Sequence, residues 1–518
     1  MKNTAEHTNS IWMATSEIPV LPALSADMKA DVCIVGAGIT GLTTAYLMGL
    51  EGKSVVVLDA GPIGGGETSR TTAHLATALD HRYFDLERIH GEKGARLAAE
   101  SHGSAIERIE AIVAQEQIQC DFERLPGYLF VPSGESTDVL DKELEAAQRA
   151  GLTEVGKLER APIRPFNTGP CLRFPHQAQF HPLKYLQALA KAIERKGGRI
   201  FTGTHAEKFE AGPPGRVSTA HGPVVTADAI VVATNTPVND LVRVHTKQAA
   251  YRTYVIAARV PKELVTPGLY WDTADPFHYA RLQREAGHEV LIVGGEDHKT
   301  GQADDSEDRF NRLEAWMRER FPMAEAVEFR WSGQVMESID GLAYIGQNSG
   351  NEPNIYIATG DSGNGMTHGT IAGMLLTDLI LGRENEWKSV YDPARIRFSA
   401  ATEFAKENLN VMTQYGDYAT PGERSSEHDI RAGEGAVIRR GLTKVAVSRD
   451  AHGILHEMSA VCPHLGCIVD WNSTESTWDC PCHGSRFEAT GKVISGPALT
   501  GLERVEHVSE RRRSGSGF

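Results

Sequence analysis

The chain has 518 residues, 41% of them hydrophobic, and a formal net charge of −15 at pH 7. This length exceeds what one hydrophobic core supports, so we expect roughly two to four domains. The composition is that of an ordinary globular protein and excludes a disordered or fibrous chain. The acidic balance excludes nucleic acid as the main partner, because phosphate binding needs a basic face.

The sequence predicts a cytoplasmic protein without a transmembrane segment. The first residues, MKNTAEHTNSIWM, lack the charged and then apolar layout of a secretory signal. The apolar segment 371–382 (IAGMLLTDLILG) is too short to span a bilayer and contains Asp378. Three dispersed cysteines are expected to be buried thiols in a reducing compartment: Cys33, Cys120 and Cys171.

Residues 31–53 predict a strand, a glycine-rich turn and a helix. The apolar run DVCIV precedes GAGITG, and LTTAYLMGLEGK follows with helical apolar spacing. In such a unit Gly36 permits the tight turn, Gly38 lets a pyrophosphate approach the backbone, and Gly41 allows the helix to pack closely on the strand. The motif indicates dinucleotide binding; a glycine turn in a non-binding α/β domain is the alternative.

A second predicted strand (SVVVLDA, residues 54–60) ends at Asp59 and Ala60. An acidic residue at this place is expected to bind the hydroxyls of the adenosine ribose. These two motifs alone leave the choice between NAD and FAD open.

Further segments resemble the D-amino-acid-oxidase-like family of FAD enzymes. They are GPIGGGETSRTTAHL (61–75), DAIVVATNTP (228–237), and DGLAYIG (340–346) with the later NIYIATGDSGNGMTHGTIAGMLLTDLI (354–380). The resemblance spans about residues 28–400 and implies an α/β FAD-binding Rossmann-type domain with an inserted sheet-based substrate domain. Its nucleotide-binding parts are expected at about 28–76, 180–240 and 340–385.

The resemblance also implies which residues contact the flavin. The helix after the turn GDSGNGM is expected to present its N-terminal amides to the pyrimidine edge of the ring. His74 is an open question, because some demethylating relatives attach flavin covalently through a histidine in a comparable loop; a non-covalent role or simple packing is the alternative. The expected cofactor-binding residues are Gly36, Gly38, Gly41, Asp59, Ala60, Arg70, Thr71, Thr72, His74, Ala233, Thr234, Gly360, Asp361, Gly363, Asn364, Gly365, Met366 and Thr367.

The inserted domain is expected to roof the flavin and shape the substrate cavity. Amino-acid-oxidising relatives place a carboxylate-binding arginine five residues before the aspartate of the DGL segment, where this chain has Val335. An ordinary α-amino acid is therefore a doubtful substrate. No catalytic acid or base is assigned. Candidate pocket residues, each of which could instead be a surface or packed residue of a strand, are Tyr128, Arg252, Tyr254, His278, Tyr279 and Arg281.

Residues 401–430 are polar and turn-rich and predict a linker to a small all-β domain at 431–510. The last residues, 511–518, are expected to form a disordered tail. Four residues of the small domain have the spacing of metal ligands: Cys462-x-His464 and, after fifteen residues, Cys480-x-x-His483. Zinc is the alternative, but zinc modules usually pair like ligands. The arrangement is that of a Rieske [2Fe-2S] cluster, with two thiolates on one iron and two imidazoles on the other.

The motifs CPHLGC (462–467) and CPCHGS (480–485) resemble respiratory-chain Rieske proteins, in which a second cysteine pair is disulfide-bonded. The resemblance implies a disulfide between Cys467 and Cys482; two free buried thiols are the alternative. Ser485 takes the place of a known hydrogen-bond donor to the cluster. Phe487 stands where high-potential respiratory relatives have a tyrosine, and phenylalanine has no hydroxyl to donate. We therefore expect a reduction potential between those of the oxygenase and respiratory classes.

From residue 10 to about 505 the chain resembles FAD oxidoreductases with a C-terminal Rieske domain, including the stretch GGEDHKTGQ (294–302). We expect a flavin-dependent enzyme that oxidises a small organic substrate, an amine or N-alkyl compound. Its electrons would pass one at a time through the cluster to an external acceptor, a protein or a quinone. One alternative is an oxygen-using flavin oxidase with a structural or regulatory Rieske domain. Another is a redox-sensing or electron-carrier protein without an organic substrate.

Overall fold

A predominantly parallel sheet forms the first part of the structure, which is a computed structural model that describes residues 8–239, 244–285, 287–348, 350, 352–424 and 426–505. The order along this sheet is β16-β17-β10-β1-β2-β7, and the hairpin β8–β9 extends it from β10. Strands β17, β10, β1, β2 and β7 run parallel to one another, and β16 is antiparallel to β17. The strands are β1 (Met28–Val35), β2 (Val55–Leu58), β7 (Arg199–Phe201), β8 (Ala206–Glu210), β9 (Gly215–Thr219), β10 (Val224–Val232), β16 (Tyr344–Gln347) and β17 (Ile355–Thr359).

Three helices pack together beside this sheet: α2 (Ile39–Leu50), α5 (Pro182–Arg195) and α7 (Gly365–Ile380). Helices α2 and α7 approach so closely that a Cβ at Gly369 would lie 2.6 Å from Ile39 Cγ2. A Cβ at Gly373 would lie 2.5 Å from Thr43 Cγ2. This close contact brings the N-termini of both helices to one edge of the sheet, where parallel α/β folds bind their ligands.

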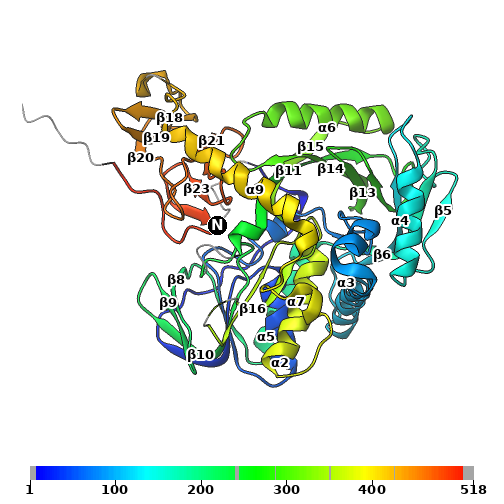
Figure 1. Cartoon of the computed structure of the whole chain (residues 1–518), viewed down its shortest axis with the longest axis horizontal. Helices are drawn as coiled ribbons and strands as arrows, with labels where there is room; N and C mark the ends of the chain where they lie inside the picture. Colours follow the sequence, from blue (N-terminus) through cyan, green and yellow to red (C-terminus); the bar gives the residue numbers. More distant parts are fainter. Residues whose placement is uncertain are drawn as a thin grey trace, which may run out of the picture.

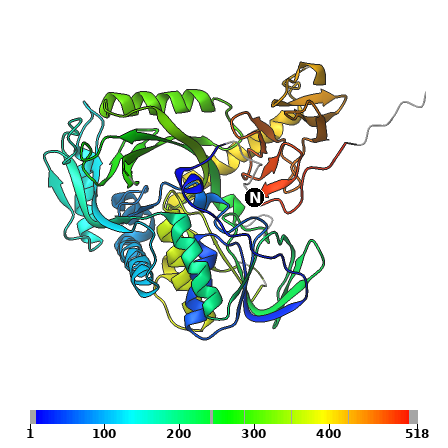
Figure 2. The same cartoon turned by 180° about the vertical axis from the view of Figure 1, so that it is seen from behind.

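A second, mixed sheet has the order β15-β11-β14-β13-β12-β4-β6-β3, with β5 beside β6. It stands over the first sheet, with α6 above it and α3 and α4 at its far end (Figures 1 and 2). Its strands are β3 (His74–Leu75), β4 (Glu123–Phe130), β5 (Gly156–Leu158), β6 (Cys171–Gln179), β11 (Gln248–Val260), β12 (Leu269–Asp272), β13 (His278–Arg284), β14 (Glu289–Lys299) and β15 (Val327–Ser338). The helices are α3 (Tyr83–Gln115), α4 (Asp138–Arg149) and α6 (Ser306–Arg320).

The segment predicted as a linker begins with a helix, α9 (Ala401–Gln414), which runs from the second sheet to the C-terminal domain (Figure 1). Its polar sequence indicated a connection, and none of its residues is buried. The domain beyond it contains two small antiparallel sheets. They comprise β18 (Gly435–Arg440), β19 (Thr443–Arg449) and β20 (Leu455–Ser459), and β21 (Asp470–Asn472), β22 (Thr477–Asp479), β23 (Arg486–Glu488) and β24 (Val493–Ser495).

Short elements complete the described chain: α1 (Ile11–Ala14), α8 (Lys388–Tyr391), η1 (Glu67–Ser69), η2 (His245–Lys247), η3 (Phe398–Ala400), η4 (Tyr415–Tyr418) and η5 (Glu427–Asp429). The expected α/β domain with an inserted sheet and a small all-β domain is confirmed. The predicted tail at 511–518 lies outside the described residues. Among the described helices, none has the length and apolar character needed to cross a membrane.

Candidate functional site

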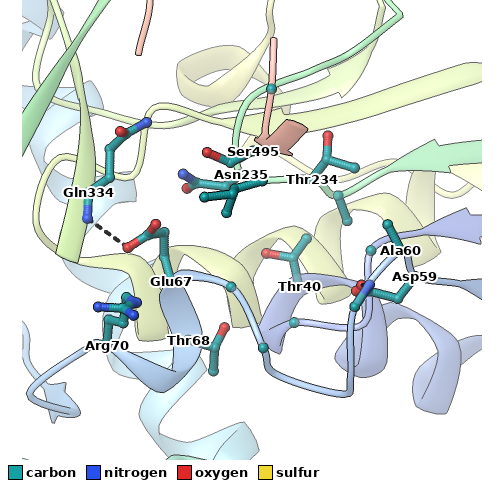
Figure 3. Close-up of a pocket in the computed structure, with 18 of the residues that line it drawn as sticks. Thr40, Asp59, Ala60, Glu67, Thr68, Arg70, Thr234, Asn235, Gln334 and Ser495 are labelled. Atoms are coloured by element: carbon teal, nitrogen blue, oxygen red, sulfur yellow. Dashed lines mark hydrogen bonds between the residues drawn. The ribbon is translucent and has the colours of Figure 1, made fainter. Parts of the chain in front are cut away.

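A long cavity runs along the carboxyl ends of β1, β10 and β17 (Figure 3). The glycine turn after β1 forms its floor, and its shape demands glycine. Gly36 has φ +112°, and a Cβ there would lie 2.3 Å from the carbonyl oxygen of Ala233. A Cβ at Gly41 would lie 1.8 Å from the carbonyl oxygen of Gly36. Gly38 is the N-cap of α2, so the N-terminal amides of this helix are directed at the cavity.

Asp59 follows β2 and lines the same cavity. One carboxylate oxygen accepts a hydrogen bond from the backbone N–H of Ala37 at 2.6 Å, and the other from Gly61 at 2.7 Å. Burial raises the pKa of this carboxyl to about 6. Asp59 therefore braces the glycine turn from the neighbouring strand, and its expected contact with ribose hydroxyls stays a prediction.

Most of the predicted flavin contacts line this cavity or a smaller one beside it. The three that line neither act through the backbone or packing. Gly41 permits the contact of helix and strand, and Gly360 takes a left-handed conformation with φ +75°. Thr367 donates a hydrogen bond to the carbonyl of Asn364 at 3.1 Å. The residues in the lining are Gly36, Gly38, Asp59, Ala60, Arg70, Thr71, Thr72, His74, Ala233, Thr234, Asp361, Gly363, Asn364, Gly365 and Met366.

Sequence reasoning missed part of the cavity wall. Glu67 accepts a hydrogen bond from the backbone N–H of Gln334 at 2.6 Å (Figure 3), which ties the loop after β2 to strand β15. Residues of the C-terminal domain also line the cavity, and Ser495 is one of them (Figure 3). No local signal links them to a motif that lies hundreds of residues earlier. The missed lining residues include Thr40, Glu67, Thr68, Asn235, Gln334, Arg486, Val493, Ile494, Ser495, Gly496, Ala498 and Leu499.

A second, smaller cavity adjoins the first and shares Thr71, Thr253, Val335, Gly363 and Met366 with it. Its wall contains three carboxyl groups and three aromatic rings, none of which was predicted except Tyr279. Burial raises the pKa of Asp80 to about 7, and the charge of Glu337 adds to this shift. Burial likewise raises the pKa of Asp297 to about 7. The acidic and aromatic lining comprises Asp80, Asp297, Glu337, Trp271, Phe277 and Tyr279.

His74 lies on β3 in this smaller cavity. The indole N–H of Trp271 donates a hydrogen bond to His74 Nδ1 at 3.2 Å. Burial, with the charge of Arg281, holds the pKa of the imidazole well below its usual range. His74 is therefore a neutral ring whose Nδ1 is an acceptor, and the two alternatives for His74, covalent attachment of flavin and a non-covalent role or packing, stay untested.

Of the six predicted pocket residues, Tyr279 lines the smaller cavity and its hydroxyl is 3.0 Å from Thr253 Oγ1. Tyr128 stacks on Tyr270 with ring centroids 5.4 Å apart. Tyr254 is hydrogen-bonded to His298 and Ser306 at 2.9 Å each. Both tyrosines belong to a hydrophobic cluster of the second sheet. Because neighbouring residues of a strand point to opposite faces, not every residue of these strands can face the cavity.

The remaining three candidates bind other protein groups and are absent from the lining of both cavities. His278 lies between Asp272 and Glu296 and stacks on the ring of Trp316. Arg281 donates hydrogen bonds to the carbonyls of Thr72 and Ala73, behind the loop that lines the cavity. Arg252 points to the C-terminal domain, where it meets Glu475. These three residues therefore contact other protein groups, and Arg281 supports the loop that lines the cavity.

The four predicted cluster ligands converge in the C-terminal domain. The rings of His464 and His483 are 5.0 Å apart at 90°, and Cys462 and Cys480 are buried beside them. A hydrogen bond from the Cys480 thiol lowers the pKa of Cys462, which favours the thiolate that binds metal. His483 Nδ1 is buried and has no hydrogen-bond partner in the described part of the chain. This donor set fits the two-thiolate, two-imidazole pattern of a Rieske cluster.

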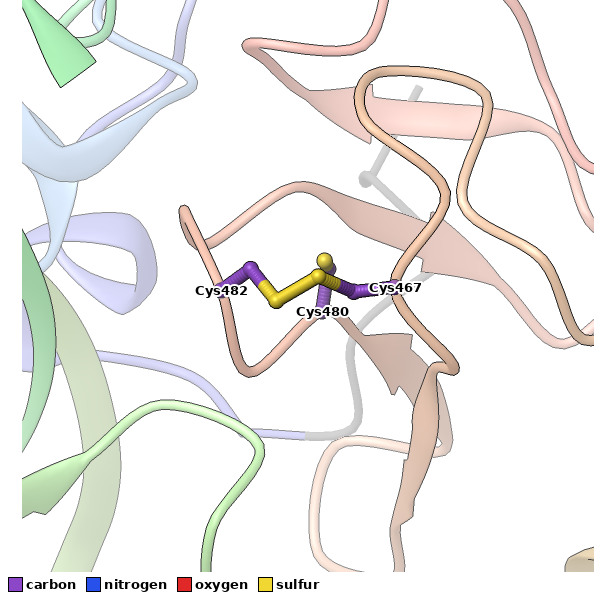
Figure 4. Close-up of side chains that lie close together, drawn as sticks. All are labelled: Cys467, Cys480 and Cys482. Carbon is purple, nitrogen blue, oxygen red and sulfur yellow. A yellow bond between two sulfur atoms is a disulfide. The ribbon is translucent and has the colours of Figure 1, made fainter. Parts of the chain in front are cut away.

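The expected disulfide between Cys467 and Cys482 is present, with a Cα–Cα distance of 6.3 Å (Figure 4). The sulfur atoms of this pair and of Cys480 lie within 4.8 Å of one another. The disulfide joins the two ligand loops directly beside the ligand position, so the alternative of two free thiols is wrong. Since Cys467 and Cys482 are bonded to each other, Cys462 and Cys480 are the cysteines of these loops that can supply thiolates.

Two segments of the chain match known protein families. Residues 31–379 match the FAD dependent oxidoreductase family, and residues 423–506 match the Rieske [2Fe-2S] domain. The chain belongs to the FAD dependent oxidoreductase family. It carries a Rieske domain at its C-terminal side, as the ligand spacing predicted, so its cofactors are FAD and a [2Fe-2S] cluster.

Known proteins resemble this FAD dependent oxidoreductase over different lengths. A putative Rieske 2Fe-2S iron-sulfur protein, YhfW of Bacillus subtilis (strain 168), is 33% identical over 97% of this chain and 98% of its own. Gamma-glutamylputrescine oxidoreductase of Escherichia coli (strain K12) is 29% identical over 73% of this chain and 90% of its own. The crystal structure of glycine oxidase from Geobacillus kaustophilus covers 71% of this chain and 99% of its own, with 19% identity and a TM-score of 0.61, and so shares the fold.

The long cavity of this FAD dependent oxidoreductase fits FAD on three structural grounds. Gly36 permits the tight turn, Gly38 lines the cavity without a side chain, and the N-terminus of α2 is directed at the same place. The N-terminus of α7 lines the cavity with Gly365 and Met366. The adjoining acidic cavity opens beside these residues, where a substrate could meet the ring.

Proposed function

We propose that this oxidoreductase oxidises a small amine or N-alkyl compound and passes the electrons one at a time through its Rieske domain to an external one-electron acceptor. When bound, FAD supplies a two-electron acceptor and the cluster a one-electron carrier. The observation that carries the choice of substrate is the acidic and aromatic lining of the smaller cavity.

Carboxylates and aromatic faces are the groups with which proteins bind ammonium ions. Asp80 and Asp297 face the smaller cavity with Glu337, and Trp271 and Tyr279 supply rings. The pKa values of Asp80 and Asp297, each about 7, allow either carboxyl to change its protonation near neutral pH. Asp297 Oδ1 is buried and has no hydrogen-bond partner among the described residues, so it is available to an ammonium N–H.

Among the described residues, those that line the same cavity include no arginine that could bind a substrate carboxylate. Val335 stands where amino-acid-oxidising relatives have an arginine, and its apolar side chain lines both cavities. The nearby Arg252 and Arg281 are held by other protein groups. These features favour an amine over an α-amino acid, and a relative named gamma-glutamylputrescine oxidoreductase agrees with this substrate class.

A carboxylate in this cavity could also take the proton that an ammonium substrate must lose before oxidation. An amine donates hydride equivalents from the carbon beside nitrogen only when the nitrogen lone pair is free. Asp297 Oδ1 or the Asp80 carboxylate would accept this proton. Thr253, whose side chain hydrogen-bonds with Tyr279 at 3.0 Å, helps to fix the cavity wall beside Asp297.

Anaerobic mixing of the holoprotein with panels of amines, N-methyl compounds, imino acids and α-amino acids tests the proposal. We expect an amine to bleach the flavin absorbance, followed by the paramagnetic resonance signal of the reduced cluster. Bleaching while the cluster stays oxidised throughout turnover would instead support an oxygen-using oxidase with a structural Rieske domain. No bleaching by any compound would support a redox sensor or electron carrier.

A further inference from the structure

One histidine of the flavin-binding part lies against both predicted histidine ligands of the cluster. His245 belongs to η2, immediately before strand β11. Its ring centroid is 5.0 Å from that of His464 and 6.0 Å from that of His483, and its plane is turned by 79° and 66° from theirs. His245 is 2% exposed, His464 8% and His483 5%. The histidine edge of the cluster site, meaning the rings of His464 and His483, is therefore covered by the flavin-binding part.

A buried carboxylate fixes the two parts to each other. Glu475 lies in the turn between β21 and β22 of the Rieske domain and is 0% exposed. Its Oε1 atom lies 3.4 Å from Arg70 and 3.4 Å from Arg252, and these arginines are buried as well. Thr8 donates a hydrogen bond to the same oxygen at 2.6 Å, and Ser332 donates another. Withdrawal of Glu475 would break its ion pairs with both buried guanidinium groups, so separation of the domains is costly.

A second contact ties the ligand loop itself to the flavin-binding part. Gln334 Nε2, on β15, donates a hydrogen bond to the carbonyl of Gly484 at 3.0 Å. Gly484 follows His483 directly, and a Cβ there would lie 2.4 Å from Ala250 Cβ on β11. On the far side of the long cavity, His205 Nε2 lies 3.0 Å from the carbonyl oxygen of Leu499. The Rieske domain is thus bound to the flavin-binding part through Gly484 and through Leu499, on two sides of the long cavity.

We propose that the Rieske domain is permanently seated on the flavin-binding part, and that His245 is a positioning residue that closes the histidine edge to solvent and to external partners. Electrons crossing this edge then move within the molecule, and an external partner has to meet the Rieske domain on another face. The proposal requires a bound cluster but not the proposed substrate or electron relay, because the contacts that carry it belong to the protein alone.

A measurement of solvent access to the reduced cluster tests whether His245 closes the histidine edge. The holoprotein is exchanged into heavy water and reduced with dithionite, and deuterium modulation is measured by pulsed paramagnetic resonance. We expect weak modulation in the wild type and a roughly twofold rise in His245→Gly, because water fills the space that the ring leaves. His452→Ala, which removes an exposed histidine of the same domain, should match the wild type. Wild-type modulation as strong as that of His245→Gly would overturn the proposal that His245 closes the histidine edge to solvent.

Hydrogen exchange of the full-length wild type tests the permanent seating without relying on a variant. Backbone amides on both sides of the contact, at 245–250 and 482–486, should be protected together and should open together in Glu475→Ala. Fast exchange of both segments in the wild type would show that the Rieske domain detaches from the flavin-binding part, and would overturn the proposal. Because dithionite supplies the electrons in the first experiment and none are needed in the second, neither result depends on finding a substrate.

Discussion

The two cofactor sites of this protein are built in opposite ways. The cluster site takes its four predicted ligands and its disulfide from two loops, 462–467 and 480–485, that lie close together in sequence. The long cavity gathers turns after β1, β2, β10 and β17, and residues 493–499 of the Rieske domain close it. A local site can be read from spacing alone, whereas a distributed site depends on how domains pack. The predictions below test how separable the two sites are.

The largest effect is expected from removal of one predicted cluster ligand. In Cys480→Ser the hydroxyl is a poor substitute for the thiolate, so iron and acid-labile sulfide should fall nearly to zero. FAD should remain bound, because Glu475 still ties the Rieske domain to the flavin-binding part and the disulfide still joins the two loops of the domain. Elemental analysis together with flavin absorbance measures both quantities. Cys171→Ser, at a buried thiol far along the second sheet, is the control and should keep both cofactors. Loss of FAD together with iron would show that the sites are not separable.

The next effect concerns the contact between the two regions. Glu475→Ala should lower the free energy of unfolding by about 3–5 kcal/mol, because it removes a buried carboxylate that forms ion pairs with both Arg70 and Arg252. Denaturant unfolding followed by flavin fluorescence measures the change. The control is Glu51→Ala, which removes an exposed pair with Arg383 and should leave stability unchanged within error. Equal stabilities of the two variants would mean that the interface does not depend on this carboxylate.

The same contrast explains what the sequence could predict. Gly36, Gly38 and Gly41 were identified because a strand, a turn and a helix are consecutive in the chain. The cluster motifs likewise keep ligand types and spacing within a short stretch. Glu475 and His245 carry no local signal, because each acquires its role from a partner in another domain.

Arg252 is a residue whose role the sequence did not predict correctly. Its place on a predicted strand of the substrate domain suggested a pocket residue, yet the structure turns it toward Glu475. Strand periodicity predicts which residues share a face of the sheet. It does not predict which domain covers that face, and a buried arginine is directed by the charge it meets. Asp80 and Asp297 were missed for the same reason, since their cavity forms only when both sheets are in place.

A smaller effect is expected at the acidic cavity, where function and stability oppose each other. The folded-state pKa of Asp80 is about 7, above its ordinary 3.8, so the folded protein binds more protons than the unfolded chain between these values. Stability contributed by this group is therefore lost as pH rises from about 4 to about 7. Asp80→Asn removes the loss and should stabilise the protein by roughly 1–3 kcal/mol at about pH 8, and little at about pH 4.

Thermal unfolding at the two pH values measures this difference. Asp228→Asn replaces an exposed aspartate and should give no pH-dependent gain. The Asp80→Asn variant should also bind an amine substrate more weakly above pH 7, where the wild-type carboxyl is charged. A variant that is less stable than the wild type at the higher pH would show that Asp80 is held as a favourable charge in the folded protein.

The smallest effect is expected within the local site, from a single hydroxyl. Ser485 Oγ accepts a hydrogen bond from the backbone N–H of Ala498 at 3.0 Å, and a hydrogen bond with Ser485 helps to lower the pKa of Cys462. Hydrogen bonds to cluster sulfur atoms stabilise the more negative, reduced state. Ser485→Ala should therefore lower the reduction potential while iron content stays at the wild-type level. Redox titration monitored by paramagnetic resonance measures the potential. Phe487→Tyr, which adds a hydroxyl two residues away, should shift it in the opposite direction, and an unchanged potential in both variants would mean that neither position reaches the cluster.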